Sequence, residues 1–213
     1  MSDVLTLDDV RLGGKVVLYR VDVNSPLEPS SGAFLDDSRL RAIIPTLRTL
    51  QNSKVVMLGH QSRPGKIDFT NMEQHADRIS RLIGKKVNFI SDICGDEAIS
   101  SIKNLKVGEM LFLDNIRMHE DENSMKKASL EETAQSEIVR KLSSVIDVYV
   151  TDAFAASHRN SPSLTGFYHS VPCIAGHLMS KEISNLQIAV NDPPRPYIAI
   201  LGGTKCDDSL KVA

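Results

Sequence analysis

The chain has 213 residues, with 25 lysines and arginines against 27 aspartates and glutamates, and its formal net charge is −2. This balance argues against a nucleic-acid-binding protein, which usually carries a basic excess, and no apolar run of about 18 residues suggests a membrane span. Hydrophobic residues make up 41% of the chain, enough for a globular core, and three unclustered cysteines behind an N-terminus unlike a signal peptide favour a cytoplasmic protein.

Short apolar runs alternate with amphipathic stretches along the chain. Residues 39–51 have helical spacing, and Pro45 is expected to kink that helix because proline has no amide hydrogen. Residues 177–191 predict one amphipathic helix. The runs predicted to form strands are residues 16–23, 55–59, 86–90, 109–113, 146–151 and 197–201.

Two further helices have predicted ends. Thr70 and Glu73 have the spacing of a capping box, and Gly84 is expected to end the helix that they begin. Ser129 and Glu132 have the same spacing before another helical stretch.

The alternation of strands and helices predicts an α/β fold, a Rossmann-like three-layer αβα domain with a mainly parallel six-stranded sheet. We expect this domain to occupy residues 1–175, with a helix and linker over residues 176–195. Residues 196–213 predict a truncated second α/β domain, because a single strand–helix unit cannot bury its own core.

Arginines recur where the predicted strands end. Ligands of parallel sheets bind beyond the carboxyl ends of the strands, and four separate connections each deliver an arginine there. Arginines fall in loops by chance, but guanidinium groups gather closely only around an anion, whose oxygens they match in geometry. The sequence therefore predicts a site for a small polyanion. The residues after the four strands are Asp22, Asn24 and Arg39; His60 and Arg63; Asn115 and Arg117; and Asp152, His158 and Arg159.

The roles of single residues stay open at this point. Asp22 can neutralise the arginines or accept a hydrogen bond from a substrate hydroxyl. His60 can donate to an anion or stabilise a local turn, and His158 is expected to be structural because Arg159 already supplies charge. No spacing indicates a metal site within the chain.

A glycine pair, Gly202 and Gly203, precedes Lys205 after the strand predicted over residues 197–201. Such a turn allows backbone amides to approach an anion, although it is not a Walker A loop. A dinucleotide-binding oxidoreductase is disfavoured because no G-x-G-x-x-G follows the first strand.

Six segments together resemble the phosphoglycerate kinase family, in its order and spacing and over essentially the whole chain. They are RVDVNSP (20–26), DSRLRAIIPTL (37–47), LGHQSRPG (58–65), LFLDNIRMH (111–119), YVTDAFAASHR (149–159) and AILGGTK (199–205). The resemblance implies a two-domain, hinge-closing glycolytic kinase of the cytoplasm, monomeric at full length. Its reaction moves a phosphoryl group between 1,3-bisphosphoglycerate and ADP, giving 3-phosphoglycerate and ATP, with Mg²⁺ on the nucleotide.

The resemblance also implies roles for individual residues. Asp22 and Asn24 would contact the glycerate hydroxyl and carboxylate region, and Arg39 would stabilise the phosphoryl group during transfer, with Lys205 opposite. Gly202, Gly203 and Lys205 would lie on the nucleotide side. The residues implied to bind the substrate, mostly through its non-transferred phosphate, are His60, Arg63, Arg117 and Arg159.

The sequence departs from the family pattern at several positions. They are Val23, Ser25, Gln61, Ser62, Ser161 and Ser209, the last where a second lysine is usual, with Lys211 nearby. The nucleotide-binding domain is nearly all missing after Ala213, so we expect 3-phosphoglycerate to bind weakly without turnover. The alternative is a stand-alone anion-binding or regulatory module without kinase activity.

Overall fold

The computed structural model describes residues 4–198 and 200. The chain divides into two compact units, Met1–Glu182 and Ile183–Ala213. The first unit contains a six-stranded sheet in the order β3-β4-β2-β1-β5-β6, and all five strand pairs are parallel. This confirms the predicted α/β fold. The strands are β1 (Val16–Arg20), β2 (Lys54–Leu58), β3 (Val87–Phe89), β4 (Met110–Phe112), β5 (Val148–Thr151) and β6 (Cys173–Ala175).

The sixth strand corrects the sequence prediction. Strand β6 pairs with β5 and was missed because its apolar run is only three residues long. The strand predicted over residues 197–201 is wrong for its described part, since Tyr197, Ile198 and Ile200 lie outside any strand. An apolar run becomes a strand only where a partner is available, and Ile200 is 92% exposed.

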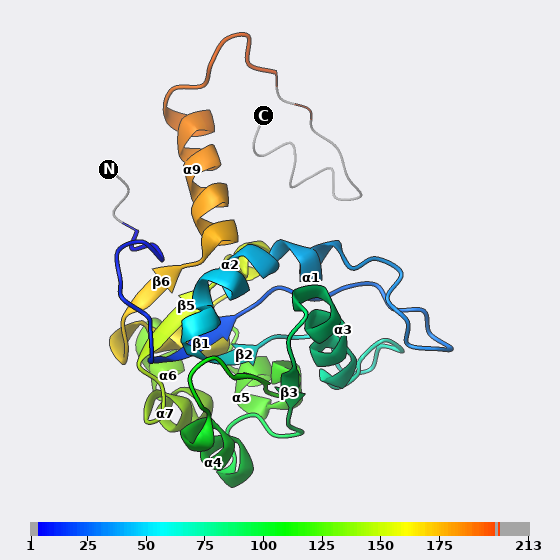
Figure 1. Ribbon diagram of the computed structural model, residues 1–213. Coiled ribbons are helices and arrows are strands. Elements are labelled where there is room, and N and C mark those ends of the chain that lie inside the picture. Colours follow the sequence, from blue (N-terminus) through cyan, green and yellow to red (C-terminus); the bar gives the residue numbers. More distant parts are fainter. Residues whose placement is uncertain (1–3, 199, 201–213) are drawn as a thin grey trace. The chain divides into compact units, whose positions relative to one another are not determined.

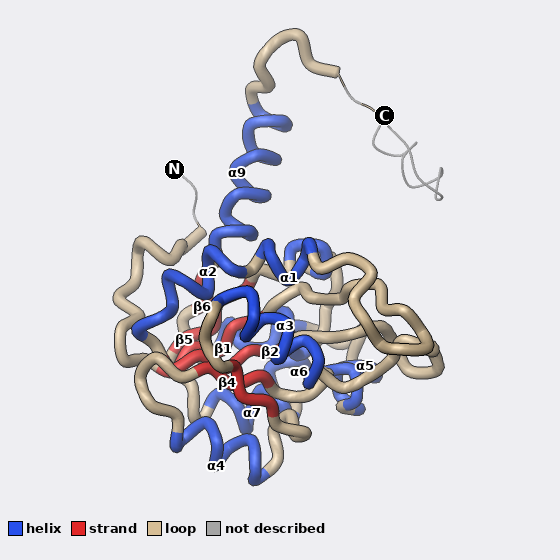
Figure 2. The backbone as a smooth tube through the Cα atoms, turned by 45° about the vertical axis from the view of Figure 1, so that its right-hand side comes forward, coloured by secondary structure: helices blue, strands red, loops and turns tan. Residues whose placement is uncertain are grey.

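Helices cover both faces of the sheet. Figure 1 and Figure 2 show α1, α2 and α3 on one side, with α4 and α7 on the other. The α-helices are α1 (Ser38–Ala42), α2 (Ile44–Thr49), α3 (Glu73–Ile83), α4 (Asp96–Asn104), α5 (Glu120–Ser124), α6 (Leu130–Ala134), α7 (Glu137–Ser143), α8 (Pro162–Thr165) and α9 (His177–Asn191). Short 3₁₀ helices are η1 (Leu50–Asn52), η2 (Ile116–Met118), η3 (Phe154–Ala156) and η4 (Gly166–His169). None of the helices described is long and apolar enough to cross a membrane.

The predicted helix breaks are largely confirmed. The helical stretch with Pro45 is interrupted at Ile43, and Pro45 lies in the first turn of α2, where its missing amide hydrogen is not needed. Gly84 ends α3 in the left-handed conformation, with φ of 68°. The bounds of α9 match the prediction.

Of the two predicted capping boxes, one is present. Ser129 and Glu132 exchange both hydrogen bonds at the start of α6. The box at Thr70 is wrong because α3 begins at Glu73, too late for Thr70 to cap it. The backbone oxygen of Thr70 instead accepts a hydrogen bond from the side chain of Asn115.

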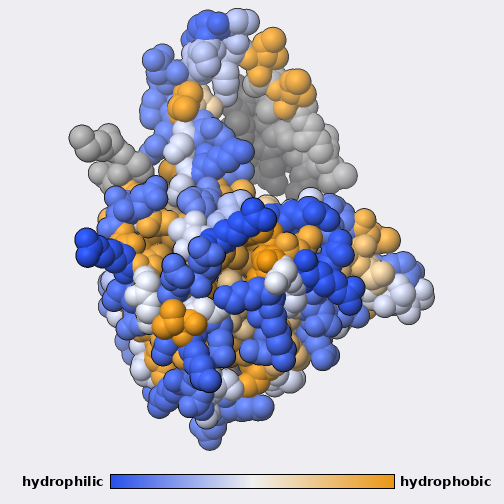
Figure 3. All heavy atoms as spheres, viewed as in Figure 1, coloured by the Kyte–Doolittle hydropathy of each residue, from blue (hydrophilic) through white to orange (hydrophobic). Residues whose placement is uncertain are grey.

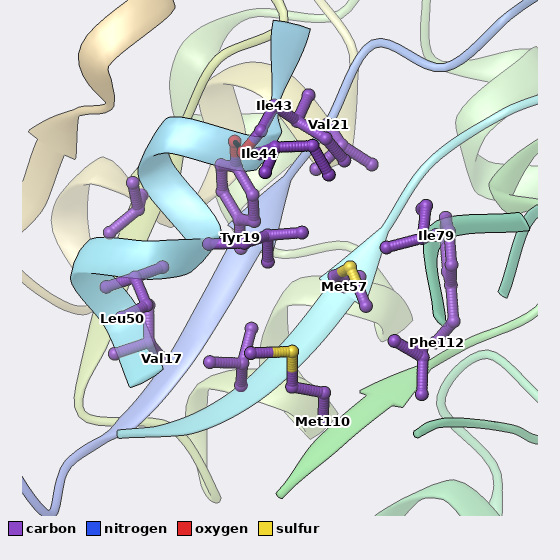
Figure 4. Close-up of a cluster of buried hydrophobic side chains, with 14 of the residues drawn as sticks. Val17, Tyr19, Val21, Ile43, Ile44, Leu50, Met57, Ile79, Met110 and Phe112 are labelled. Carbon is purple, nitrogen blue, oxygen red and sulfur yellow. Dashed lines mark hydrogen bonds between the residues drawn. The ribbon is translucent and has the colours of Figure 1, made fainter. Parts of the chain in front are cut away.

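Two apolar cores lie on opposite faces of the sheet, as the strand alternation requires. One core contains alternate β1 residues together with α1, α2 and α3 (Figure 4), and its members include Val17, Tyr19, Ile43, Met57 and Phe112. The other contains Leu18 and Val56 from the same strands, packed with α4 and α7. Hydrophilic side chains cover most of the face shown in Figure 3. Because the strands are buried on both faces of the sheet, their sequences are nearly continuous runs of apolar residues rather than alternating apolar and polar ones.

The first turn of α9 is fastened to the sheet by a buried carboxylate. Asp152 follows β5, is fully buried, and accepts hydrogen bonds from the Tyr19 hydroxyl (2.6 Å), the Thr46 hydroxyl (2.6 Å) and the Met179 amide (2.9 Å). A Cβ atom at Gly176 would come within 2.2 Å of this carboxylate, so the close approach requires glycine. The positive N-terminal end of the helix favours the negative charge held there.

Candidate anion-binding site

The connections after β1, β2, β4 and β5 leave the sheet at the same edge, because all of its strands run parallel. They bring together most of the side chains that the sequence indicated. Asp22 and Asn24 follow β1, Arg39 lies in α1, His60 and Arg63 follow β2, Arg117 lies in η2, and Arg159 follows η3. Gly202, Gly203 and Lys205 lie outside the described residues.

His60 is a buried, neutral donor at this edge. Its side chain is 5% exposed, and its Nδ1 lies 3.3 Å from Nη2 of Arg20. Because a guanidinium group donates and cannot accept, Nδ1 must accept, which places the proton of the ring on Nε2. Burial, followed by the charges of Arg20, Arg117 and Arg159, lowers the pKa of His60 to about 2. The ring therefore offers an N–H to a ligand without carrying charge.

Three of the predicted arginines line one cavity of about 690 Å³, namely Arg63, Arg117 and Arg159. The same cavity is lined by Lys126 and His158, together with Pro64, Asn123 and Asn160. Among the described residues that line it there is no aspartate or glutamate. The structure thus places His158 beside the arginines, whereas the sequence favoured a structural role for it. It also adds Lys126, which follows α5 rather than a strand and was therefore not indicated by the sequence.

The positively charged groups around the cavity repel one another. Burial and the nearby charges of Arg159 and Arg20 lower the pKa of Arg117, and Arg63 adds to this effect. Glu122 acts in the opposite direction. An anion placed among these groups would relieve their repulsion and take up their unused N–H donors.

Asp22 and Asn24 are held by neighbouring parts of the site. Asp22 forms an ion pair with Arg39, whose side chain is 46% exposed, and this is the neutralising contact that the sequence left open. Oδ1 of Asn24 accepts the amide hydrogen of Ser62 at 2.7 Å. That bond assigns the oxygen of the Asn24 amide and leaves its NH₂ group as a donor.

Sequence reasoning missed Arg20 and Glu122, both of which are buried. Nε of Arg20 donates to the Ser163 hydroxyl (3.1 Å), which in turn donates to Glu122 (2.7 Å). Glu122 also accepts from the Ser161 hydroxyl and the Ser163 amide. An arginine inside the apolar run of β1 was a signal that could have been read, whereas nothing in the sequence marks Glu122.

The described residues do not form a metal centre, since none of their His, Cys, Asp and Glu side chains gather in groups of three or more that could hold an ion. The arginines and the neutral His60 at this edge can recognise an anion. Two acids close to this edge are already engaged, Asp22 with Arg39 and Glu122 with the 161–163 turn.

Comparison with known proteins gives consistent matches. A family model described as phosphoglycerate kinase matches residues 7–213. Phosphoglycerate kinase of Methanocorpusculum labreanum is 45% identical over 208 residues, which cover 98% of this chain and 51% of that protein. The corresponding protein of Methanothermobacter thermautotrophicus is 44% identical over 209 residues, covering 97% and 50%.

Solved structures agree with these matches. The crystal structure of phosphoglycerate kinase from Pyrococcus horikoshii OT3 superposes with a TM-score of 0.92 at 43% identity, covering 98% of this chain and 51% of that one. The structure from Coxiella burnetii gives 0.76 at 25% identity, covering 97% and 50%. The chain spans about half the length of the curated relatives it matches. With the family model extending over nearly all of its residues, the chain belongs to the phosphoglycerate kinase family.

Proposed function

We propose that this chain supplies the 3-phosphoglycerate side of a phosphoglycerate kinase, which transfers a phosphoryl group reversibly between 1,3-bisphosphoglycerate and ADP in glycolysis. The observation that carries the proposal is the cavity lined by Arg63, Arg117 and Arg159, to which no aspartate or glutamate of the described residues contributes. A phosphate monoester carries up to two negative charges and several acceptor oxygens, which suit convergent guanidinium groups.

In this proposal the non-transferred phosphate lies among Arg63, Arg117 and Arg159, with the Nε2–H group of His60 as a further donor. Asn24 donates through its NH₂ group, and Asp22 accepts a hydrogen bond from the glycerate hydroxyl. These contacts hold the acceptor carboxylate in place. That carboxylate is ionised at neutral pH, so the reaction needs no general base.

Phosphoryl transfer depends mainly on positioning and charge stabilisation. Arg39 is suited to this task because it is the more exposed member of its pair with Asp22 and can turn toward a second ligand. Lys205 would add charge from the nucleotide side, where Gly202 and Gly203 would approach the phosphates of Mg-ADP or Mg-ATP.

The proposed organisation follows from these roles. Residues 1–175 form the 3-phosphoglycerate-binding domain, and residues 196–213 begin the nucleotide-binding domain. Residues 176–195 are the interdomain helix and linker that connect the two. Closure of the two domains would exclude water, which would otherwise hydrolyse the acyl phosphate. We propose a cytoplasmic protein that is monomeric at full length, with small-molecule ligands rather than nucleic acid or membrane as partners.

Calorimetric titration of the 213-residue chain tests the proposal. We expect 3-phosphoglycerate to bind weakly and glycerate, which lacks the phosphate, to bind at least about tenfold more weakly, since charge-assisted hydrogen bonds contribute about 1.5–3 kcal/mol each. Arg63→Ala should abolish binding, Arg39→Ala should keep most of it, and Arg48→Ala, an exposed arginine of α2, is the matched control. Equal affinity for glycerate, micromolar ATP binding or robust ATP production by this chain would contradict the proposal.

A further inference from the structure

Gln61 is a fully buried carboxamide next to His60. Its Nε2 donates to the backbone oxygen of Ser25 (2.9 Å), and its Oε1 accepts the backbone amide of Ser25 (3.2 Å). The same Oε1 lies 3.1 Å from Nε2 of His75 in α3. One side chain therefore joins the segment after β1, the segment after β2 and a helix.

The Gln61 side chain takes the place of backbone pairing beyond the ends of β1 and β2. The register of β1 and β2 ends at Arg20 and Leu58, and the last backbone bond beyond it runs from the Val21 amide to the Leu58 oxygen. Further along, the two segments diverge, and the carboxamide of Gln61 makes the two bonds with Ser25 that a facing backbone would make. An apolar side chain of the same size would leave two buried backbone groups without partners, which is costly.

The two segments that Gln61 joins carry the candidate ligands. Ser62, the next residue, donates its amide to Asn24 and accepts a hydrogen bond from Arg117 through its backbone oxygen. The backbone oxygen of Gln61 itself accepts from Asn115 at 2.8 Å. A shift of residues 60–63 away from residues 22–25 would therefore disturb contacts of Asn24, His60 and Arg117 together.

We propose that Gln61 is a positioning residue of the anion site: its carboxamide holds the 22–25 segment against the 60–63 segment so that Asn24 and His60 present their donors to the same anion. Gln61 has no role as a ligand in this arrangement, because its carboxamide is fully buried and its three polar contacts are all with this chain. The inference rests on the proposed function, since it names what orients that site.

The test replaces Gln61 by methionine, which has nearly the same shape and cannot replace the paired hydrogen bonds. In the 213-residue chain, at a temperature where circular dichroism shows each variant folded, Gln61→Met should raise the Kd for 3-phosphoglycerate about tenfold or more, since small misplacements of binding groups are costly. Gln51→Met, at an exposed position in η1, should leave the Kd unchanged. In the Asn24→Ala background the effect of Gln61→Met should be smaller, because part of it acts through Asn24.

Amide hydrogen exchange tests, without any ligand, whether Gln61 holds the 22–25 and 60–63 segments together. The amides of Ser25 and Ser62 should exchange at least about tenfold faster in Gln61→Met, while the amide of Val56 in the middle of β2 should exchange as in the parent.

If the methionine variant does not fold, Gln61→Asn, which keeps the amide but is one methylene shorter, takes its place with the same expectations. Failure of the parent to bind 3-phosphoglycerate would overturn the proposed function alone. Unchanged exchange at Ser25 and Ser62, or an unchanged Kd in a parent that binds, would overturn the role of Gln61.

Discussion

Ser62 has a backbone φ of 55°, a left-handed conformation that no other non-glycine residue in the described part of the chain adopts. Side chains with a Cβ adopt it at a cost of roughly 1–2 kcal/mol. The residue is held there by its amide bond to Asn24 and by its hydroxyl, which donates to Asp68 at 2.6 Å. Strain is thus concentrated in the segment between His60 and Arg63, where the candidate ligands are.

A pair of variants separates the strain from the hydrogen bond. Ser62→Ala keeps the left-handed backbone and loses the bond to Asp68, so the free energy of unfolding should fall by about 1 kcal/mol. Ser62→Gly loses the same bond but relieves the strain, and should be more stable than Ser62→Ala by about 1 kcal/mol. Urea denaturation of the two variants measures the difference. An alanine variant at least as stable as the glycine variant would show that the segment carries no such strain.

At the scale of elements, the start of α9 depends on a few polar contacts with its neighbours. Thr46 of α2 is fully buried, donates to Asp152 and accepts the amide hydrogen of His177 at 3.0 Å. The Thr49 hydroxyl lies 2.8 Å from Nε2 of the same histidine. Helix α2, strand β5 and the first turn of α9 therefore share one hydrogen-bond network, and its donors include amides that have no partner within the helix.

Thr46→Val tests this network, because valine has the shape of threonine without the hydroxyl. The change leaves the half-buried His177 amide without its acceptor and removes one donor from the buried Asp152, so we expect a loss of about 1–3 kcal/mol in the free energy of unfolding. Thr46→Ser, which keeps the hydroxyl, should retain most of the stability. Faster hydrogen exchange of the His177 and Met179 amides in the valine variant would locate the effect at the start of α9. Equal stability of the valine and serine variants would rule the network out as a source of stability.

At the scale of the whole molecule, two buried histidines link stability to pH. Burial lowers the pKa of His75 to about 4, and burial with nearby arginines lowers that of His60 to about 2. The unfolded chain holds these rings near the ordinary value of about 6.5, so unfolding takes up protons below that pH. The stabilisation is complete above pH 6.5 and is lost progressively as the pH falls toward the folded-state values.

We therefore expect the free energy of unfolding to drop between pH 6.5 and pH 5, with each ring approaching about 1.4 kcal/mol per pH unit. Urea denaturation at several pH values measures the slope. His60→Gln, which keeps a side chain able to accept a hydrogen bond from Arg20, should make the slope shallower by up to about 1.4 kcal/mol per pH unit, the contribution of one ring. A slope that is the same in parent and His60→Gln would show that His60 is not held neutral on folding.

The sequence was sufficient where topology decides the outcome. Parallel strands end at one edge, so the arginines that follow β2, β4 and β5 were predictable as neighbours, and the periodicity of α9 gave its bounds. The sequence was insufficient where one tertiary contact determines the local structure. The short β6 needs β5 as its partner, and α3 begins at Glu73, too late for Thr70 to cap it. The link from Arg20 through Ser163 to Glu122 joins residues more than a hundred positions apart. Such pairings depend on the packed structure and leave no local pattern.

The interior place of β1 has a consequence for how the protein is made. Strand β1 is translated first, yet one of its two neighbours is β5, and the amide of Val16 bonds to Asp147, 131 residues later. A ribosome adding roughly 5–20 residues per second therefore leaves that side of β1 without its partner for about 7–26 seconds. Apolar strands with an unpaired side favour aggregation and chaperone binding, so we expect residues 16–20 to be most open to such contacts until residues 148–151 have been made.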